Sequence, residues 1–209
     1  GSQMIRDPKD LQRYNASERA NHWVVGISFI LLALSGLAFF HPAFFPLTQL
    51  FGGAVWARIL HPFIGVLMAV SFLGLFFRFR HLNQMTAADK EWLARAGEMV
   101  NGNDHNMPEQ GKYNGGQKAM FWGSALCMLL LTVSGVLIWR AYFGFDVNVV
   151  RLAVVVHAAV AALMIALIMV HIYAAIWVKG TIRAMWYGTV TRAWAKQHHR
   201  AWYREVSGK

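Results

Sequence analysis

The residues from 149 to 178 decide the fold, and their sequence is VVRLAVVVHAAVAALMIALIMVHIYAAIWV. A helix needs about 20 apolar residues to cross a bilayer. This stretch is longer than that, and Arg151 is its only charged side chain. Three further apolar runs are also long enough, at about residues 22–40, 55–77 and 119–139. The sequence therefore predicts an all-α integral membrane bundle of four transmembrane helices.

The composition agrees with a membrane protein. Of the 209 residues, 56% are hydrophobic and 14% are charged, whereas soluble domains have about 25% charged residues. The same hydrophobicity excludes an intrinsically disordered chain. Because Cys127 is the only cysteine, the chain cannot form an intrachain disulfide or hold an iron–sulfur cluster on its own thiolates. A metal site would therefore draw on the nine histidines.

The basic residues are unevenly distributed along the chain. There are 20 Lys and Arg against 10 Asp and Glu, which gives a net charge of +10. In a soluble protein this charge would indicate nucleic acid, but here the basic residues lie between apolar runs, so no nucleic-acid partner is expected. Seventeen of them lie in the N-terminal arm, in the polar loop 78–118 or in the tail from residue 179. The other three are Arg58, Arg140 and Arg151.

Such an excess of basic residues marks the cytoplasmic side of a membrane protein. We expect both termini and the loop 78–118 on the cytoplasmic face of a bacterial inner (plasma) membrane, with the loops 40–55 and 140–149 outside. The chain then forms one membrane domain over residues 1–209, with a cytoplasmic arm 1–21, four helices across 22–178 and a basic tail 179–209. The aromatic side chains of the tail suit a membrane surface, and residues 87–100 suit a short surface helix.

Four histidines fall within or at the edges of the predicted spans: His22, His61, His157 and His171. An ionisable side chain inside a membrane is energetically costly, so each is a candidate functional residue. His22 and His171 lie toward the cytoplasmic ends of their helices. His61 and His157 lie toward the outer ends. The histidines are therefore paired by depth, two near each face.

The spacing from His157 to His171 is fourteen residues. On a helix this is close to four full turns, so both rings leave the same face with their backbones roughly 21 Å apart. His22 can complete an inner site with His171, and His61 an outer site with His157. Histidine is an established haem ligand, and the cores of helix bundles hold such cofactors. The pattern predicts a cytochrome with two haem b groups, each with two axial imidazoles.

Glycines near the histidines fit this prediction. Gly26 and Gly65 each lie one turn after a candidate ligand, and Gly36 lies fourteen residues after His22. A flat macrocycle needs backbone without bulky side chains beside it. Glycine also helps membrane helices to pack against one another, which is the alternative interpretation.

Two arginines lie one turn before candidate ligands. Arg19 precedes His22 by three residues, and Arg58 precedes His61 by three. Since residues i and i+3 are neighbours on a helix, each guanidinium could pair with a haem propionate. Flanking of the membrane interface is the alternative explanation. The remaining histidines are expected to be solvated or interfacial, with His41 and His81 the candidate exceptions: His41, His81, His105, His198 and His199.

Several short strings, weak individually, occur in a specific order. They are ERANHW at 18–23, ARILHPF at 57–63, GKYNGGQK at 111–118, SGVLIWR at 134–140, HIY at 171–173, WVKG at 177–180, WAKQHH at 194–199 and WYRE at 202–205. Together they resemble the gamma subunit, a b-type cytochrome, of the membrane-bound respiratory formate dehydrogenases, over nearly the whole chain. Two departures are Ala141 and Ala201, where the family favours proline, and neither is a proposed ligand.

The resemblance implies the same ligand pairs, His22 with His171 for the cytoplasmic-side haem and His61 with His157 for the periplasmic-side haem. It also implies that a quinone, menaquinone or ubiquinone, binds near the inner haem. The positions that match its contacts are Asn114 and Gly116, with Gln117 as a weaker addition. Without the resemblance, a turn followed by a helix start would be the preferred interpretation of Asn114-Gly-Gly-Gln117.

The resemblance further implies partners. An iron–sulfur beta subunit delivers electrons to the outer haem, and a molybdenum or tungsten alpha subunit oxidises formate, in a complex that assembles as a trimer of heterotrimers. This chain anchors the complex in the membrane lipids and passes electrons inward to the quinone. Two alternatives remain open at this point. One is the dihaem cytochrome subunit of an uptake hydrogenase or another quinone-reducing oxidoreductase, and the other is a haem-free transporter with a histidine relay.

Overall fold

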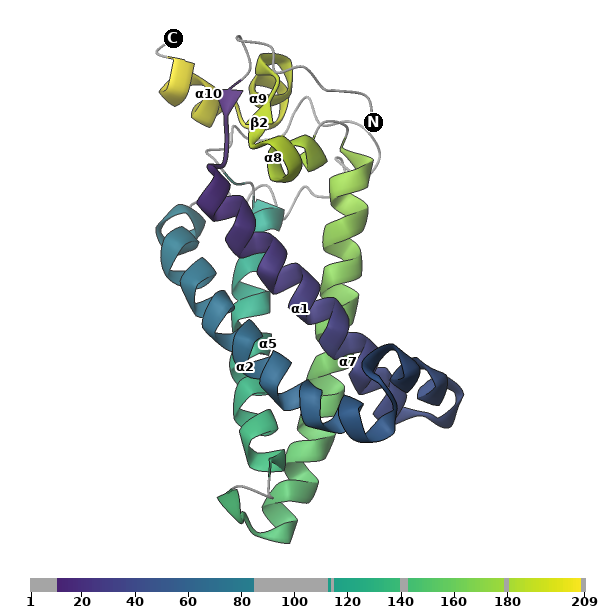
Figure 1. Cartoon of the computed structure of the whole chain (residues 1–209). Helices are drawn as coiled ribbons and strands as arrows, with labels where there is room; N and C mark the ends of the chain where they lie inside the picture. The colour runs from purple at the N-terminus through teal and green to yellow at the C-terminus, as the bar shows by residue number, and fades with distance from the viewer. Residues whose placement is uncertain (1–10, 85–112, 114, 140–142, 179–180, 208–209) are drawn as a thin grey trace. The chain divides into compact units, whose positions relative to one another are not determined.

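Four long helices dominate the computed structural model of the chain (Figure 1). The structure describes residues 11–84, 113, 115–139, 143–178 and 181–207. The long helices are α1 (Ala16–Phe40), α2 (Ala54–Phe79), α5 (Gly115–Ile138) and α7 (Val147–Trp177). Each is long and apolar enough to cross a membrane. The prediction of a four-helix membrane bundle is therefore confirmed, with boundaries within six residues of those expected.

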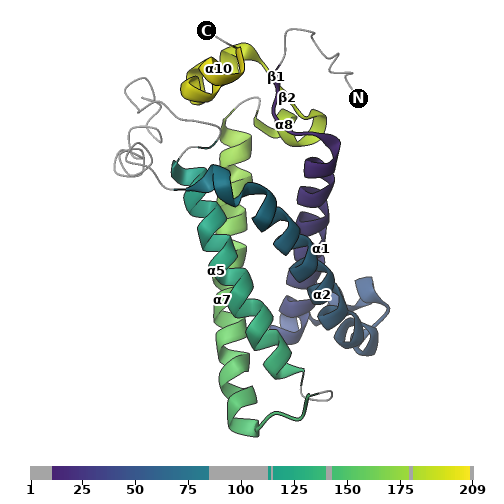
Figure 2. The same ribbon diagram turned by 90° about the vertical axis from the view of Figure 1, so that its left-hand side faces the viewer.

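The chain divides into two compact units. We call residues 20–77 and 123–170 the bundle unit, and residues 1–19, 78–122 and 171–209 the terminal unit. Within the bundle unit, α5 and α7 run side by side in both ribbon views (Figures 1 and 2). The divisions fall inside the long helices, so each of these helices contributes residues to both units.

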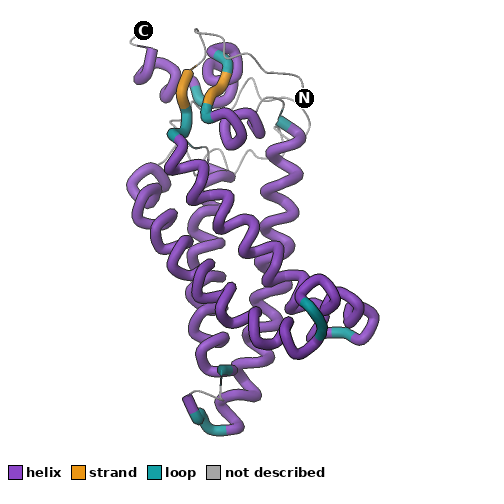
Figure 3. Tube along the Cα trace, viewed as in Figure 1, coloured by secondary structure: helices purple, strands orange, loops and turns teal. Residues whose placement is uncertain are grey.

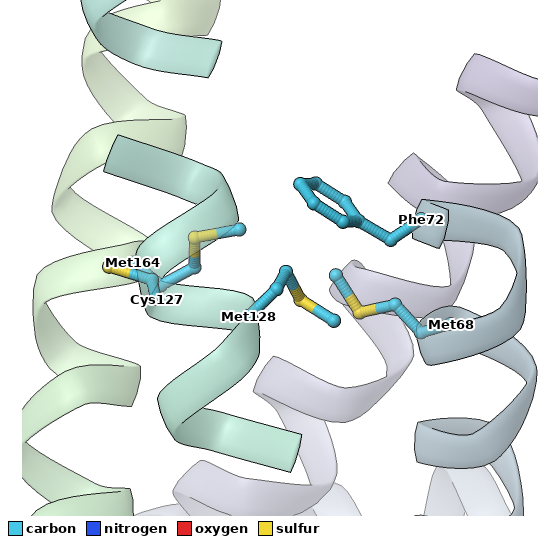
Figure 4. Packing of buried hydrophobic residues seen from close by; sticks show 5 residues of the cluster. All are labelled: Met68, Phe72, Cys127, Met128 and Met164. Atoms are coloured by element: carbon cyan, nitrogen blue, oxygen red, sulfur yellow. The ribbon is translucent and has the colours of Figure 1, made fainter. Parts of the chain in front are cut away.

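Sulfur-containing and aromatic side chains form the core of the bundle unit. Met68 and Phe72 from α2, Cys127 and Met128 from α5, and Met164 from α7 meet there, each at most 8% exposed (Figure 4). The outer surfaces of the same helices are also apolar, as Val70, Leu129 and Val155 show, each at least 60% exposed. Helices that are apolar both inside and outside are typical of a membrane span.

Four serines and Thr48 are the buried polar side chains of the bundle unit among the described residues. The Ser35 hydroxyl lies 3.0 Å from the Leu31 carbonyl, and the Ser134 hydroxyl lies 2.7 Å from the Leu130 carbonyl. Because each hydroxyl can bond to the carbonyl one turn earlier, its burial in an apolar helix is tolerated. Small residues of this kind also let neighbouring helices approach closely.

The connection from α1 to α2 is the 3-10 helix η1 (Pro42–Phe51). His41 caps its start, since its Nδ1 accepts a hydrogen bond from the Ala43 backbone amide at 3.0 Å. Gly52 ends it with φ of 90°, a left-handed conformation that glycine adopts without strain. A local structural role therefore accounts for His41.

A two-stranded sheet in the terminal unit joins the two ends of the chain. Strand β1 (Leu11–Gln12) pairs antiparallel with β2 (Thr189–Val190), with Leu11 opposite Val190 (Figure 3). The Gly188 carbonyl extends this pairing, because it accepts from the backbone amides of Arg13 at 2.6 Å and Tyr14 at 3.0 Å. No pattern in the sequence predicts these two strands.

Arg13 is buried in the terminal unit among aromatic rings. Its guanidinium carbon lies 4.9 to 5.6 Å from the centres of Tyr14, Tyr113, Trp194 and Trp202, and the residue is 4% exposed. Each ring face attracts the cation. Burial, together with the neighbouring Tyr14, raises the pKa of Tyr113 well above its ordinary value, so that ring stays neutral. Arg13 thus links the N-terminal arm to the C-terminal tail.

The tail folds into three short helices, α8 (Thr181–Tyr187), α9 (Arg192–His198) and α10 (Arg200–Ser207). The expectation that His199 is solvated is wrong. It is 1% exposed and stacks on Trp194 with ring centres 5.0 Å apart. This burial depends on contacts within the folded tail that sequence spacing does not indicate. The helix predicted at 87–100 lies outside the described residues.

The core of the bundle unit permits a stability prediction. Met164→Ala is expected to destabilise the folded chain by about 2 kcal/mol, the lower end of the range for buried methionines, because the cavity forfeits van der Waals contacts that lipid cannot replace. Thermal unfolding of the full chain in detergent measures this effect. Met169→Ala on the same helix is the control, since Met169 is 65% exposed. Equal destabilisation by both changes would contradict the assignment of Met164 to the core.

Candidate haem site

The structure brings together the two histidines predicted for the outer site. His61 lies on α2 and His157 on α7, both within the bundle unit, with ring centres 6.3 Å apart and ring planes at 68°. Metal–imidazole bonds are about 2.0–2.1 Å long and a ring centre lies about 1.1 Å from its own nitrogen. A linear link through one metal ion therefore separates two ring centres by about 6 to 6.5 Å. The observed separation fits one metal ion between the two rings.

Each of these two imidazoles has a serine partner from another helix. Ser35 Oγ on α1 lies 2.6 Å from His61 Nδ1, and Ser134 Oγ on α5 lies 2.8 Å from His157 Nδ1. Both serines are buried, at 0% and 3% exposure. All four long helices thus contribute to the outer pair, two with an imidazole and two with a hydroxyl.

The residue after each serine is a glycine that lies close to the same imidazole. A Cβ at Gly36 would lie 3.6 Å from His61 Cε1, and one at Gly135 would lie 3.5 Å from His157 Cε1. Gly36 was associated in sequence with His22, but the structure places it against His61. Gly26 has nothing within 4 Å of such a Cβ, and the nearest atom at Gly65 belongs to Leu32. Neither Gly26 nor Gly65 therefore has a histidine atom within 4 Å of a Cβ built at its position.

The inner pair is placed on its helices as the sequence predicted. His22 lies on α1 and is half-buried, with its ring edge-on to Trp23 at 5.3 Å between ring centres. His171 lies on α7, and α7 runs without interruption from Val147 to Trp177 through both His157 and His171. His22 belongs to the bundle unit and His171 to the terminal unit, so their pairing stays a prediction.

The two arginines predicted to contact propionates occupy different surroundings. Arg19 Nε lies 3.4 Å from the Asn15 carbonyl, one turn before it on α1. A Cβ at Gly188 would also lie 3.1 Å from the same Nε. Arg58 is exposed on α2, one turn before His61. The propionate role of each stays a prediction.

Two of the three predicted quinone residues lie at the start of α5. Gly116 and Gln117 are in its first turn, whereas Asn114 lies outside the described residues. Two later side chains tie this end of α5 to the end of α2 within the terminal unit. Lys118 Nζ donates to the Gln84 carbonyl at 3.1 Å, and Trp122 Nε1 donates to the Asn83 carbonyl at 2.7 Å. These contacts hold the first turns of α5, which include Gly116 and Gln117, against the end of α2.

The chemistry of the donor set suits haem rather than a bare metal ion. In the part of the chain that the structure describes, no three His, Cys, Asp or Glu side chains are grouped to hold a metal. Haem iron needs only two protein ligands, since the porphyrin supplies the others, and histidine is one of its usual ligands. His61 and His157 therefore fit haem.

Ser35 and Ser134 are absent from the site predicted from sequence. The sequence feature that could have pointed to them is a Ser-Gly pair inside an apolar helix, which occurs at Ser35-Gly36 and at Ser134-Gly135. A buried Ser-Gly pair is also common helix-packing chemistry. These two pairs differ from Ser-Gly pairs that only help helices to pack because each serine contacts an imidazole on the next long helix.

Comparisons with known proteins show the family to which the chain belongs. The sequence profile of the prokaryotic cytochrome b561 family matches residues 13–188. The formate dehydrogenase cytochrome b556(fdo) subunit of Escherichia coli strain K12 is 50% identical over 196 residues, which cover 93% of this chain and 92% of that protein. The nitrate-inducible cytochrome b556(Fdn) subunit of the same strain is 46% identical, over 95% of this chain and 92% of that protein.

A more distant relative extends the comparison. The formate dehydrogenase cytochrome b556 subunit of Haemophilus influenzae is 42% identical, over 92% of this chain and 82% of that protein. The range that the family profile matches, residues 13–188, includes all four long helices. This chain belongs to the prokaryotic cytochrome b561 family and, within it, to the cytochrome b556 subunits of formate dehydrogenase.

Proposed function

We propose that this chain is the dihaem cytochrome b subunit of a membrane-bound formate dehydrogenase, carrying electrons from the periplasmic side to a quinone near the cytoplasmic side. Haem b is the cofactor of this family of bacterial membrane proteins. The observation that carries the proposal is the 6.3 Å separation of the His61 and His157 rings, which suits one iron between them. When bound, haem iron accepts and releases single electrons.

His61 and His157 would form the outer site and would hold the iron from two helices of the bundle unit. The buried serines on α1 and α5 hold the imidazoles, and the apolar side chains of the bundle unit exclude water from the site. Arg58, one turn before His61, lies at the outer rim, where its guanidinium is available to a propionate. The chain's own residues therefore supply ligation, orientation and a dry environment.

The inner site is proposed from the sequence pattern and from the relatives. His22 and His171 are its ligands, and Arg19 is its propionate partner. Because His157 and His171 lie fourteen residues apart on the unbroken helix α7, one helix contributes a ligand to each of two stacked sites. Stacked sites give a path for electrons across the bilayer.

The quinone site is proposed beside the inner haem, at the start of α5. Asn114, Gly116 and Gln117 are its residues, with polar groups that can donate to a quinone carbonyl. Menaquinone or ubiquinone would take up its protons from the cytoplasm. This placement rests on the orientation in which both termini and the loop 78–118 are cytoplasmic, as the distribution of basic residues favours.

The partners follow from the names of the relatives, which are subunits of formate dehydrogenase. An iron–sulfur beta subunit is proposed to meet the outer face, and a molybdenum or tungsten alpha subunit to oxidise formate beyond it. The whole chain acts as one membrane domain that anchors a trimer of such heterotrimers. Moving one electron inward against the membrane potential stores about 2.3 kcal/mol per 100 mV.

A spectroscopic experiment on the purified complex tests this proposal. Formate is expected to produce b-type absorbance in a reduced-minus-oxidised spectrum, with two haems per chain, and an added quinone is expected to reoxidise both. Hydrogen in place of formate is the control and is expected to leave the haems oxidised. Reduction by hydrogen alone would instead assign the chain to a hydrogenase, and a preparation with fewer than two haems would overturn the dihaem proposal.

A further inference from the structure

We propose that Ser35 and Ser134 are positioning residues that fix the protonation and the rotation of the two outer axial imidazoles and thereby set the redox potential of the outer haem. This inference rests on the proposed function, since it takes His61 and His157 as the ligands. It concerns hydroxyl groups on α1 and α5 that are not themselves ligands.

The hydrogen bonds around Ser35 are compatible with the tautomer of His61 in which Nε2 is available to bind iron. The Ser35 hydroxyl lies 2.6 Å from His61 Nδ1, and it lies 3.0 and 3.2 Å from the Leu31 and Leu32 carbonyls. A carbonyl only accepts, so the single hydroxyl proton goes to a carbonyl when the hydroxyl accepts from Nδ1–H. The proton of the neutral imidazole is then on Nδ1, which leaves the Nε2 lone pair for the metal.

The arrangement around Ser134 repeats this pattern on a different pair of helices. The Ser134 hydroxyl lies 2.8 Å from His157 Nδ1 and 2.7 and 3.2 Å from the Leu130 and Leu131 carbonyls. The serine-to-histidine separation is 26 residues in the first case and 23 in the second. Two independent segments of the chain therefore build the same contact, which argues against a chance packing of one hydroxyl.

The glycine after each serine leaves space for the ring that the hydroxyl holds. A Cβ at Gly36 or Gly135 would be in contact with the Cε1 atom of the imidazole, at 3.6 and 3.5 Å. Both distances are ordinary van der Waals contacts, so a Cβ would just fit, and only a side chain longer than alanine would crowd the ring. Together, the hydroxyl at Nδ1 and the glycine at Cε1 fix the rotation of each ring. The resulting angle between the two ring planes is 68°.

These two constraints have separate consequences for a bound haem. An acceptor at Nδ1–H raises the basicity of the ligand, which favours ferric iron and lowers the midpoint potential. The angle between two axial imidazole planes controls the anisotropy of the low-spin ferric iron, and planes far from parallel give a strongly anisotropic electron paramagnetic resonance signal. Removal of a hydroxyl is therefore expected to raise the potential and to change this signal.

The test uses the full chain with its haems in detergent. Ser35→Ala and Ser134→Ala are compared by haem-to-protein ratio, redox titration and electron paramagnetic resonance, with Ser124→Ala as the control. Ser124 is buried on the same helix as Ser134, at 6% exposure, and lies ten residues before it, roughly 15 Å along the axis. The outer-haem signals are identified by their loss in His61→Ala.

The expected result is that both haems are retained, that the outer potential becomes more positive, and that the inner haem and the Ser124→Ala chain are unchanged. Two retained haems with an unaltered outer potential and signal would overturn this inference and leave the proposed function standing. A wild-type chain without an outer haem would overturn the proposed function instead. If Ser35→Ala loses the outer haem, Ser35→Thr is expected to restore it with the wild-type potential, and failure to do so would also overturn the inference.

Discussion

A chain carrying His61→Ala or His157→Ala is expected to lose the outer haem and retain the inner one. The ring centres lie 6.3 Å apart, which suits the proposal that both side chains bind one iron, and alanine supplies no ligand to the iron. If the chain holds two bis-histidine haems as proposed, the haem-to-chain ratio should fall by about half, because only one of the two sites is disrupted. Haem extraction and a reduced-minus-oxidised spectrum of the purified chain measure the loss.

His41→Ala provides the matched control for this experiment. His41 lies in the same unit and is exposed, and its imidazole caps η1 by accepting from the Ala43 amide. The same substitution there is expected to leave both haems in place. Retention of two haems with unchanged spectra in both His61→Ala and His157→Ala would show that the outer site lies elsewhere.

Gly188→Ala is expected to produce the largest loss of stability in the terminal unit. Gly188 has φ of 80°, which an L-residue adopts at an energetic cost. A Cβ there would also collide with the Tyr14 carbonyl oxygen. Strain and overpacking each contribute about 1–3 kcal/mol, so a total of about 3 kcal/mol is expected. Limited proteolysis of the full chain measures the release of the arm from the tail.

Gly144→Ala separates the two contributions to this effect. Gly144 also has a positive φ, 64°, but a Cβ there would meet nothing within 4 Å. It is therefore expected to lose only about 1 kcal/mol, from backbone strain alone. Equal protease resistance of the Gly188→Ala chain and the wild-type chain would mean that β1 and β2 do not pair in the folded protein.

Features that depend on residues close together in sequence were predictable. The four spans follow from hydropathy, because a bilayer requires a continuous apolar helix of fixed length. His157 and His171 share one helix, so their common face follows from helical periodicity alone. The same local logic identified His61 as a candidate ligand, since a titratable side chain within a span needs a reason to be there.

Contacts between distant segments were not predictable. Ser35 meets His61 across 26 residues, and Gly36 contacts this ring rather than the neighbourhood of His22. Periodicity gives the face on which a residue lies, but not which neighbouring helix covers that face. Four apolar helices can pack in several orders with similar burial, because lipid and protein side chains are almost equally apolar.

The terminal unit shows the same limit at the two ends of the chain. Arg13 is a charged residue in a polar N-terminal arm, where solvent exposure is expected. It is nevertheless 4% exposed, and four aromatic rings surround its guanidinium. His199 is likewise buried against Trp194. The pairing of β1 with β2 joins residues 11–12 to 189–190, and two-residue strands have no periodic pattern to reveal them.

By itself, the amino-acid sequence determined that this chain is a four-span membrane protein with four histidines in its spans, since hydropathy and helical phase are properties of neighbouring residues. The tertiary structure alone decided that His61 and His157 face each other, that two serines hold their rings, and that the N-terminal arm closes on the C-terminal tail. These are contacts between residues far apart in the chain, and their energies depend on the packing of helices rather than on any local pattern.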